Sequence, residues 1–139
     1  MNYLLIPYTK MNNQLRIDLL ETALYGGSNY WYWLSDESHD IVMKYGETEN
    51  GSFSEKMMAA INAGENIKIH DAEEFDEDNL NECLLGIINL ESIVKGEKIM
   101  RENPKYVRHY ADAISEMEGD STTADVWFQL CVMGELVFG

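Results

Sequence analysis

The first clear pattern along the chain is a run of apolar residues at helical spacing. In residues 11–25, apolar side chains recur every three or four positions and form two adjoining rows: Leu15, Leu19 and Ala23, and Ile17, Leu20 and Leu24. A period of 3.6 residues produces this spacing. Gly26 and Gly27 follow directly, and glycine commonly ends a helix. The pattern therefore predicts a helix over residues 11–25 that stops at the glycine pair.

Alternating or short apolar segments indicate strands. Residues 66–70 alternate between polar and apolar positions, and residues 83–88 form a second apolar segment after an acidic stretch. Such segments are typical of strands, and we expect these two to pair antiparallel. Residues 3–6 are interpreted as a short strand stopped by Pro7.

Two further strands are expected between the glycine pair and the middle of the chain. Residues 30–34 are rich in aromatic residues, and residues 40–45 contain Ile41 and Val42. Polar residues at 35–39 separate the two segments. This arrangement favours a hairpin.

Capping residues and a proline mark the starts of four later helices. Ser52 and Glu55 have the spacing of a capping box, and the helix that they open should run through Ile61 and end before Gly64. Three helices should follow the strands. Their expected starting points are Asn89, Pro104, and either Ser121 or Thr122.

The end of the chain is apolar on every side of a helix. Residues 124–138 contain Trp127, Phe128 and eight other apolar side chains. A helix of this composition cannot be a one-sided surface helix. We expect it to be the central helix of the fold, and an interface between two copies of the chain is the alternative.

These patterns together predict the fold class. The chain should be an α+β protein with a small, mainly antiparallel sheet packed against about five helices, and with a helical C-terminal third. Its 139 residues fit a single compact domain over residues 1–139.

Charge narrows the choice of partners. The chain has 10 Lys and Arg against 25 Asp and Glu, a net charge of −15, which opposes direct binding to nucleic acid or to anionic lipid. Acidic residues concentrate after residue 70, and five of them form a candidate partner-binding surface: Glu73, Glu74, Asp76, Glu77 and Asp78. Such a run is usually a solvated loop. It can also imitate a row of phosphates and occupy the basic groove of a nucleic-acid enzyme.

The sequence also supports expectations about cellular location and about cofactors. Its apolar runs are too short for a membrane span, and residues 1–7 do not resemble a secretory leader, so we expect a cytoplasmic protein. Cys83 and Cys131 are widely separated and are interpreted as reduced, buried thiols. Neither a metal-binding pattern nor a cofactor motif is recognised, and we expect no cofactor.

Two unusual turns are candidates for a binding site. Gly26, Gly27, Asn29 and Trp31 belong to a segment of glycines and aromatic residues that could form the wall of a ligand pocket. The alternative is a helix end followed by a half-buried strand. His70 and Asp71 are the only plausible pair for proton transfer. The alternative is a turn aspartate that caps backbone amides beside a partly exposed histidine.

The two turns together carry a family resemblance. Residues 26–31 read Gly-Gly-Ser-Asn-Tyr-Trp, and residues 69–73 read Ile-His-Asp-Ala-Glu. In combination they resemble a family of small bacteriophage and mobile-element proteins in which both turns recur. The closing segments 122–128 and 134–139 resemble one branch of that family. The resemblance implies an origin in a phage or mobile element and brings no established activity with it.

Three hypotheses for function follow. In the first, a non-enzymatic phage protein counteracts a bacterial defence system by sequestering a small nucleotide-like ligand in a pocket formed by Gly26, Gly27, Asn29, Trp31, His70 and Asp71. In the second, the acidic surface mimics nucleic acid and inhibits a CRISPR or restriction effector. The third is a small hydrolase that uses His70 and Asp71. The expected partners are a host defence protein or its small-molecule signal, and a homodimer is possible.

Overall fold

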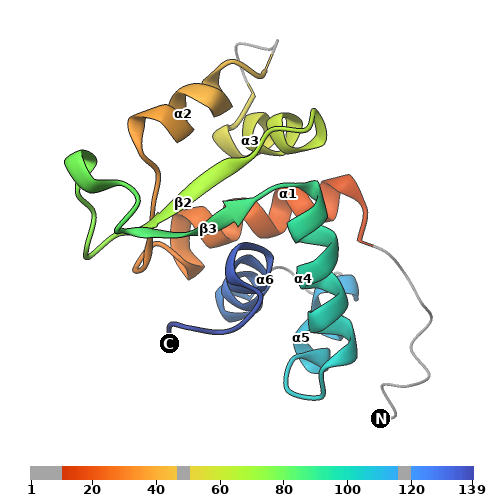
Figure 1. Ribbon diagram of the computed structural model, residues 1–139. Helices are drawn as coiled ribbons and strands as arrows, with labels where there is room; N and C mark the ends of the chain where they lie inside the picture. Colours follow the sequence, from red (N-terminus) through yellow and green to blue (C-terminus); the bar gives the residue numbers. More distant parts are fainter. Residues whose placement is uncertain (1–10, 47–50, 116–119) are drawn as a thin grey trace.

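The chain folds into helices arranged around a short sheet, as its computed structural model shows (Figure 1). The structure describes residues 11–46, 51–115 and 120–139. Within these residues there are six α-helices: α1 (Asn13–Thr22), α2 (Asp36–Met43), α3 (Phe53–Asn62), α4 (Leu90–Glu102), α5 (Val107–Ile114) and α6 (Ser121–Met133). The strands are β1 (Tyr32–Trp33), β2 (Ile67–Asp71) and β3 (Leu84–Ile88). The expected α+β class and the helical C-terminal third are confirmed, whereas the strand expected at residues 3–6 lies outside the described residues.

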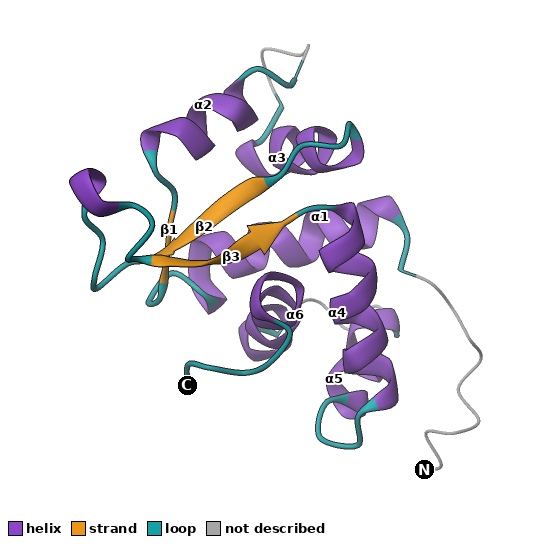
Figure 2. Cartoon of the chain, in the orientation of Figure 1, coloured by secondary structure: helices purple, strands orange, loops and turns teal. Residues whose placement is uncertain are grey.

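The sheet is antiparallel, with strand order β1-β2-β3. The expected pairing of β2 with β3 is confirmed, and its register places Ile67 opposite Ile88. The register shifts between Ile69 and His70, where the pairing is irregular. In the view of Figure 2, α2 and α3 lie on one side of the strands, and α4, α5 and α6 lie on the other.

The hairpin expected over residues 30–45 is wrong. Only Tyr32–Trp33 forms a strand, and it pairs with β2. Residues 40–45 belong largely to α2 and the turn that follows it. The physical reason is the Ser35 side chain, which accepts a hydrogen bond from the backbone N of Ser38 at 3.2 Å and caps the helix. Two acids in the first turn of α2 further stabilise the helix N-terminus.

The helix expected before the glycine pair is confirmed, with an unexpected last turn. α1 continues directly into η2 (Ala23–Gly27), a turn of π-helix. The Asn12 side chain caps α1 by accepting from the backbone N of Leu15 at 2.8 Å. Because η2 is wider than an α-helical turn, it sets the direction in which the glycine-aromatic segment leaves the helix.

The capping expectations are confirmed for two helices and corrected for two. Ser52 with Glu55 opens α3, and Asn89 with Ser92 opens α4, each as a reciprocal capping box. By contrast, α5 begins at Val107, after a turn that contains Pro104. The cap of α6 is Asp120, and neither Ser121 nor Thr122 has that role.

Helix α6 is the central helix of the fold, as expected. It packs against α4, η2, α1, β3 and α5, and the Trp127 and Phe128 side chains are both 0% exposed. It ends earlier than expected, however, because Gly134 adopts a left-handed conformation with φ of 76° that glycine tolerates best. The apolar residues after Gly134 form a separate tail.

Two further expectations from the sequence concern the cysteines and membrane-spanning helices. Both cysteines, Cys83 and Cys131, are buried free thiols, as expected. Burial raises the pKa of the Cys131 thiol well above its ordinary value. No helix in the described ranges is both long enough and apolar enough to cross a bilayer.

Candidate functional site

The glycine-aromatic turn is attached to α6 through one carboxylate. Oδ1 of Asp125 accepts hydrogen bonds from Ser28 Oγ at 2.7 Å and from Trp31 Nε1 at 2.8 Å. Its Oδ2 accepts from the Tyr30 hydroxyl at 2.8 Å. Partial burial and the bond to Asp125 raise the pKa of Tyr30 to about 12. The turn is therefore locked to the central helix by charge-assisted bonds.

A second α6 side chain holds the C-terminal tail in place. Oε1 of Gln129 accepts from the backbone N atoms of Val137 and Phe138, both at 2.9 Å. Its Nε2 donates to the Phe138 carbonyl and to Asp125 Oδ2, both at 3.1 Å. The Phe138 ring then stacks on Trp31, with centroids 5.3 Å apart and planes 10° apart. Turn, tail and central helix are thus one hydrogen-bonded unit.

An open cleft of about 320 Å³ lies between α6 and this tail. It is lined by Thr122, Asp125, Val126, Gln129, Leu136, Val137, Phe138 and Gly139. Each Asp125 carboxylate oxygen already accepts two hydrogen bonds. The negative charge at the cleft opposes a phosphate group, so the cleft does not suit a nucleotide.

The four turn residues predicted to bind ligand, Gly26, Gly27, Asn29 and Trp31, differ in their exposure to solvent. Trp31 is 1% exposed, and its ring is enclosed by Phe128 and Phe138. Gly27 lies against the backbone of α6, whereas Gly26 and Asn29 face solvent. Trp31 and Gly27 thus have structural contacts in the folded chain. A ligand-binding role for any of the four stays a prediction.

Gly27→Ala is expected to destabilise the fold by about 1–3 kcal/mol. A Cβ at Gly27 would overlap the carbonyl oxygen of Ser121 and separate the turn from α6. Gly26→Ala is the matched control, since nothing lies within 4 Å of a Cβ there. Urea unfolding of both variants measures the difference. Equal midpoints for the two variants would contradict the close packing of Gly27.

Backbone hydrogen bonds place the His70-Asp71 turn next to the glycine-aromatic turn. The Trp31 carbonyl accepts from the backbone N of Ala72 at 2.8 Å, and Trp33 is paired with His70 in the sheet. The side chains of Trp31 and His70 have different surroundings, because Trp31 contacts α6 and the tail whereas His70 lies edge-on to Phe75. The two turns are adjacent, and the cleft of the tail includes neither Trp31 nor His70.

His70 and Asp71 have separate roles. Oδ1 of Asp71 accepts from the backbone N atoms of Glu73 at 2.9 Å and Glu74 at 3.4 Å, as a turn cap does. The His70 side chain is buried, which corrects the expectation of a partly exposed histidine, and neither ring nitrogen has a hydrogen-bond partner among the described residues. Burial, with a smaller effect from Lys68, lowers the pKa of His70. The two residues do not form a hydrogen-bonded acid-base pair in this structure.

The acidic loop projects from the sheet between β2 and β3, beside the start of α2 (green, at the left of Figure 1). All five acids predicted for the partner surface are exposed: Glu73, Glu74, Asp76, Glu77 and Asp78. Asp76 caps the short 3₁₀ helix η3 (Glu77–Asn79), and its bonds to Asn79 and Asp78 lower its pKa. Partial desolvation, then the charges of Asp36 and Asp78, raise the pKa of Glu77. Like charges are therefore gathered at this edge.

Sequence reasoning missed the part of this surface that α2 contributes. Asp36 and Glu37 are exposed in the first turn of α2, close enough to act on the charges of the loop and of His70. The available signal was Ser35 followed by two acids, which is a helix start. Trp33 and Phe75 were not among the predicted site residues, although Trp33 closes the glycine-aromatic segment, and their rings are 6.0 Å apart.

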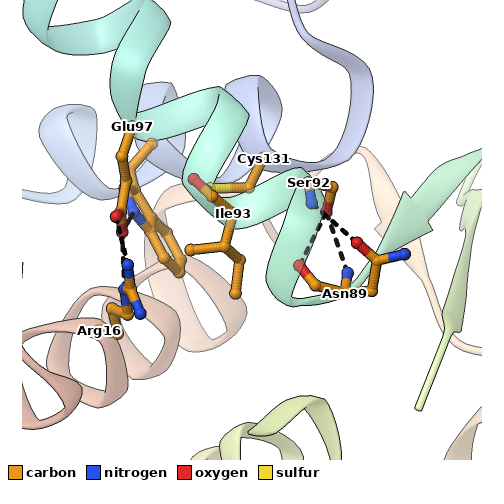
Figure 3. A network of polar contacts seen from close by, with 7 residues as sticks. Arg16, Asn89, Ser92, Ile93, Glu97 and Cys131 are labelled. Carbon is orange, nitrogen blue, oxygen red and sulfur yellow. Dashed lines mark hydrogen bonds and ion pairs between the residues drawn. The ribbon is translucent and has the colours of Figure 1, made fainter. Parts of the chain in front are cut away.

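A buried ion pair holds α1 to α4 on the side away from this edge. Figure 3 shows Glu97 of α4 pointing at Arg16 of α1. The Arg16 guanidinium donates twice to Glu97, from Nη2 at 2.6 Å and from Nε at 3.0 Å, and Trp127 Nε1 donates to Oε2 of the same carboxylate at 3.0 Å. The hydrogen bond to Glu97 raises the pKa of Arg16. We assign this network to structure, because the Glu97 carboxylate is engaged by Arg16 and Trp127 within the core.

The fold and these surfaces define a small α+β protein with an acidic edge that also displays aromatic rings. In the described part of the chain, no group of three or more His, Cys, Asp or Glu is placed to hold a metal ion. Comparison with protein-family models, with curated proteins and with solved structures found no match. The proposal for function therefore rests on the geometry, the charge and the sequence resemblance.

Proposed function

We propose that this protein is a non-enzymatic binding protein that places an acidic face on a basic surface of a partner protein, as a mimic of nucleic acid. The acidic face consists of Asp36, Glu37, Glu73, Glu74, Asp76, Glu77 and Asp78. The observation that carries the proposal is that exposed acids from two separate segments, the first turn of α2 and the β2–β3 loop, lie at the same edge of the fold. The pKa of Glu77 is accordingly raised by desolvation and then by the charges of Asp36 and Asp78. Folding thus brings together negative charges that repel one another.

The charges of the acidic face are free to act outward. Arg16 pairs with Glu97, and Lys95 pairs with Glu91. Neither of these ion pairs involves the acidic face. Exposed charges that lack a local counter-ion attract an oppositely charged surface over roughly 8–10 Å at ordinary salt. Complementary charge also speeds association and excludes wrong partners. The natural counterpart of this face is a basic groove that otherwise holds nucleic acid.

The small-molecule hypothesis has less support from the geometry. A base could stack on Trp31 only after the ring had left Phe128 and Phe138, and Asp125 places negative charge at the neighbouring cleft. The hydrolase hypothesis has less support as well, since Asp71 is engaged in its turn and His70 is buried. Both stay predictions, with the tests given below.

The biological setting is part of the proposal. The resemblance to small phage and mobile-element proteins supports a counter-defence role, with a CRISPR or restriction effector as the partner in the host cytoplasm. The net charge of −15 supports a protein partner, because it opposes direct contact with nucleic acid or an anionic membrane.

Neutralising the loop should weaken inhibition of a nucleic-acid-binding effector. We expect Glu74→Gln, Glu77→Gln and Asp78→Asn together to reduce competition with DNA about tenfold or more at low salt, since rim charges act mainly on association. The measurement is displacement of labelled DNA from a panel of purified CRISPR and restriction effectors over a salt series. Stability should stay level or rise slightly, because like-charge repulsion is relieved.

The matched control changes net charge equally at another place. Glu102→Gln, Asp112→Asn and Glu135→Gln remove the same number of exposed acids from α4, α5 and the tail. This variant should compete like the unmodified chain. Equal weakening by both variants would show that only net charge matters and would remove the acidic face as a specific site. If the unmodified chain displaces DNA from none of the effectors, the proposal that the protein mimics nucleic acid is wrong.

A further inference from the structure

One tryptophan of the chain is displayed at the acidic face. Trp31 and Trp127 are 1% and 0% exposed, whereas Trp33 in β1 is 52% exposed. Large aromatic side chains usually bury most of their surface. Tryptophan at a surface is also enriched among the residues that contribute most to protein–protein binding. Trp33 is therefore the aromatic residue of this face to be explained.

Trp33 belongs to a cluster of three rings. Its ring lies 6.0 Å from Phe75 in a tilted arrangement, and Phe75 lies 6.0 Å from His70 with the planes 82° apart. His70 is 1% exposed, and both ring nitrogens lack a hydrogen-bond partner among the described residues. Buried polar groups are nearly always hydrogen-bonded. The buried imidazole thus lies edge-on to Phe75 with its hydrogen-bonding capacity unused.

Acidic residues lie close in sequence to both Trp33 and Phe75. Asp36 and Glu37 follow Trp33 closely along the chain. The negative charge of Glu37 partly opposes the lowering of the His70 pKa by burial. Phe75 is flanked by acids of the loop. The face of an aromatic ring attracts cations, tryptophan most strongly. Aromatic faces combined with carboxylates suit a cation that can stack and donate hydrogen bonds at once.

Arginine is the side chain that meets all these conditions. Its guanidinium is planar, stacks on aromatic rings and donates two parallel hydrogen bonds to a carboxylate. It carries donors only, which suits a face that displays carboxylates. Lysine matches the charge but has no flat surface to stack. The ring cluster therefore distinguishes the two cations, which charge alone does not.

We propose that Trp33 and Phe75 form an anchor for an arginine side chain of the partner protein, with Asp36 and Glu37 as its carboxylates. This inference rests on the proposed function, because it names the group that the acidic face recognises. The anchor would give the acidic face a specific contact in addition to its general electrostatic attraction. A basic partner should then be selected by an arginine at a defined position.

Two synthetic peptides of equal charge test the anchor. Octa-arginine and octa-lysine are titrated into the unmodified chain, with calorimetry for affinity and tryptophan fluorescence for location. We expect octa-arginine to bind about 5- to 30-fold more tightly, the range that a cation–π contact supplies. The Trp33 emission should change on binding, because the other two tryptophans are buried.

Variants separate the anchor from the charge. Trp33→Leu should abolish the preference for arginine and leave octa-lysine binding unchanged, while Tyr25→Leu, at a residue that is 63% exposed, should keep the preference. Trp33→Phe and Phe75→Leu provide second variants if Trp33→Leu does not fold, and each should reduce the preference. Circular dichroism confirms folding in every case.

The outcomes distinguish this inference from the function on which it rests. Equal binding of both peptides by the unmodified chain, weakened by the loop variant Glu74→Gln/Glu77→Gln/Asp78→Asn, overturns the anchor and keeps the acidic face. A preference for arginine that survives in folded Trp33 and Phe75 variants also overturns the anchor. If neither peptide binds, both the anchor and the acidic docking face are overturned.

Discussion

Glu97→Leu should destabilise the fold by about 3–5 kcal/mol, the cost of breaking a buried ion pair by removing one partner. The Glu97 carboxylate accepts both donors of the Arg16 fork and the indole N–H of Trp127. Leucine is similar in size and accepts no hydrogen bond. The Arg16 guanidinium, whose side chain is 15% exposed, would be left charged without its partner. Urea unfolding followed by circular dichroism measures the loss.

A double variant identifies the cause of that loss. Arg16→Met with Glu97→Leu removes both charges, so it should recover much of the stability lost in Glu97→Leu alone. The exposed pair Glu91 with Lys95 is the control, and Lys95→Ala should leave the unfolding midpoint unchanged. A double variant less stable than Glu97→Leu would show that packing at this site, and not the unpaired charge, dominates.

Trp31→Ala should also cost about 3–5 kcal/mol, because it empties a close-packed site. The indole is stacked on Phe138, contacts Phe128 and donates to Asp125. Trp31→Phe keeps most of the ring and removes the N–H, and we expect a smaller loss of about 1–3 kcal/mol. Thermal unfolding of both variants gives the comparison.

Trp33→Ala is the matched control, since the same substitution two residues later affects a half-exposed ring. It should change the free energy of unfolding by about 1 kcal/mol or less. The pair also tests the ligand hypothesis for the glycine-aromatic turn. If Trp31→Ala is as stable as the unmodified chain and loses a nucleotide that otherwise copurifies, detected by native mass spectrometry, Trp31 belongs to a ligand site and the core assignment is wrong.

Features that depend on neighbouring residues could be predicted from the sequence. The capping box of Ser52 with Glu55, the cap at Asn89 and the helix that ends at the glycine pair all satisfy local backbone groups. The strand at 66–70 followed from alternation, and the central position of α6 followed from its apolar residues. The acidity of residues 73–78 could likewise be predicted, because it depends only on which residues the sequence contains.

Only the tertiary structure shows which distant side chains contact one another at the candidate site. Residues 40–45 carry strand-forming side chains, yet the Ser35 cap and the packing of α2 on α3 and β2 made this segment largely helical. Asp125 lies 94 positions after Trp31, and Glu97 lies 81 positions after Arg16, so no local pattern links them. The acidic face needs α2 and the loop to lie side by side. The sequence by itself determined local helices, caps and charge, because these depend on nearby residues; which distant side chains meet depended on packing of the whole chain.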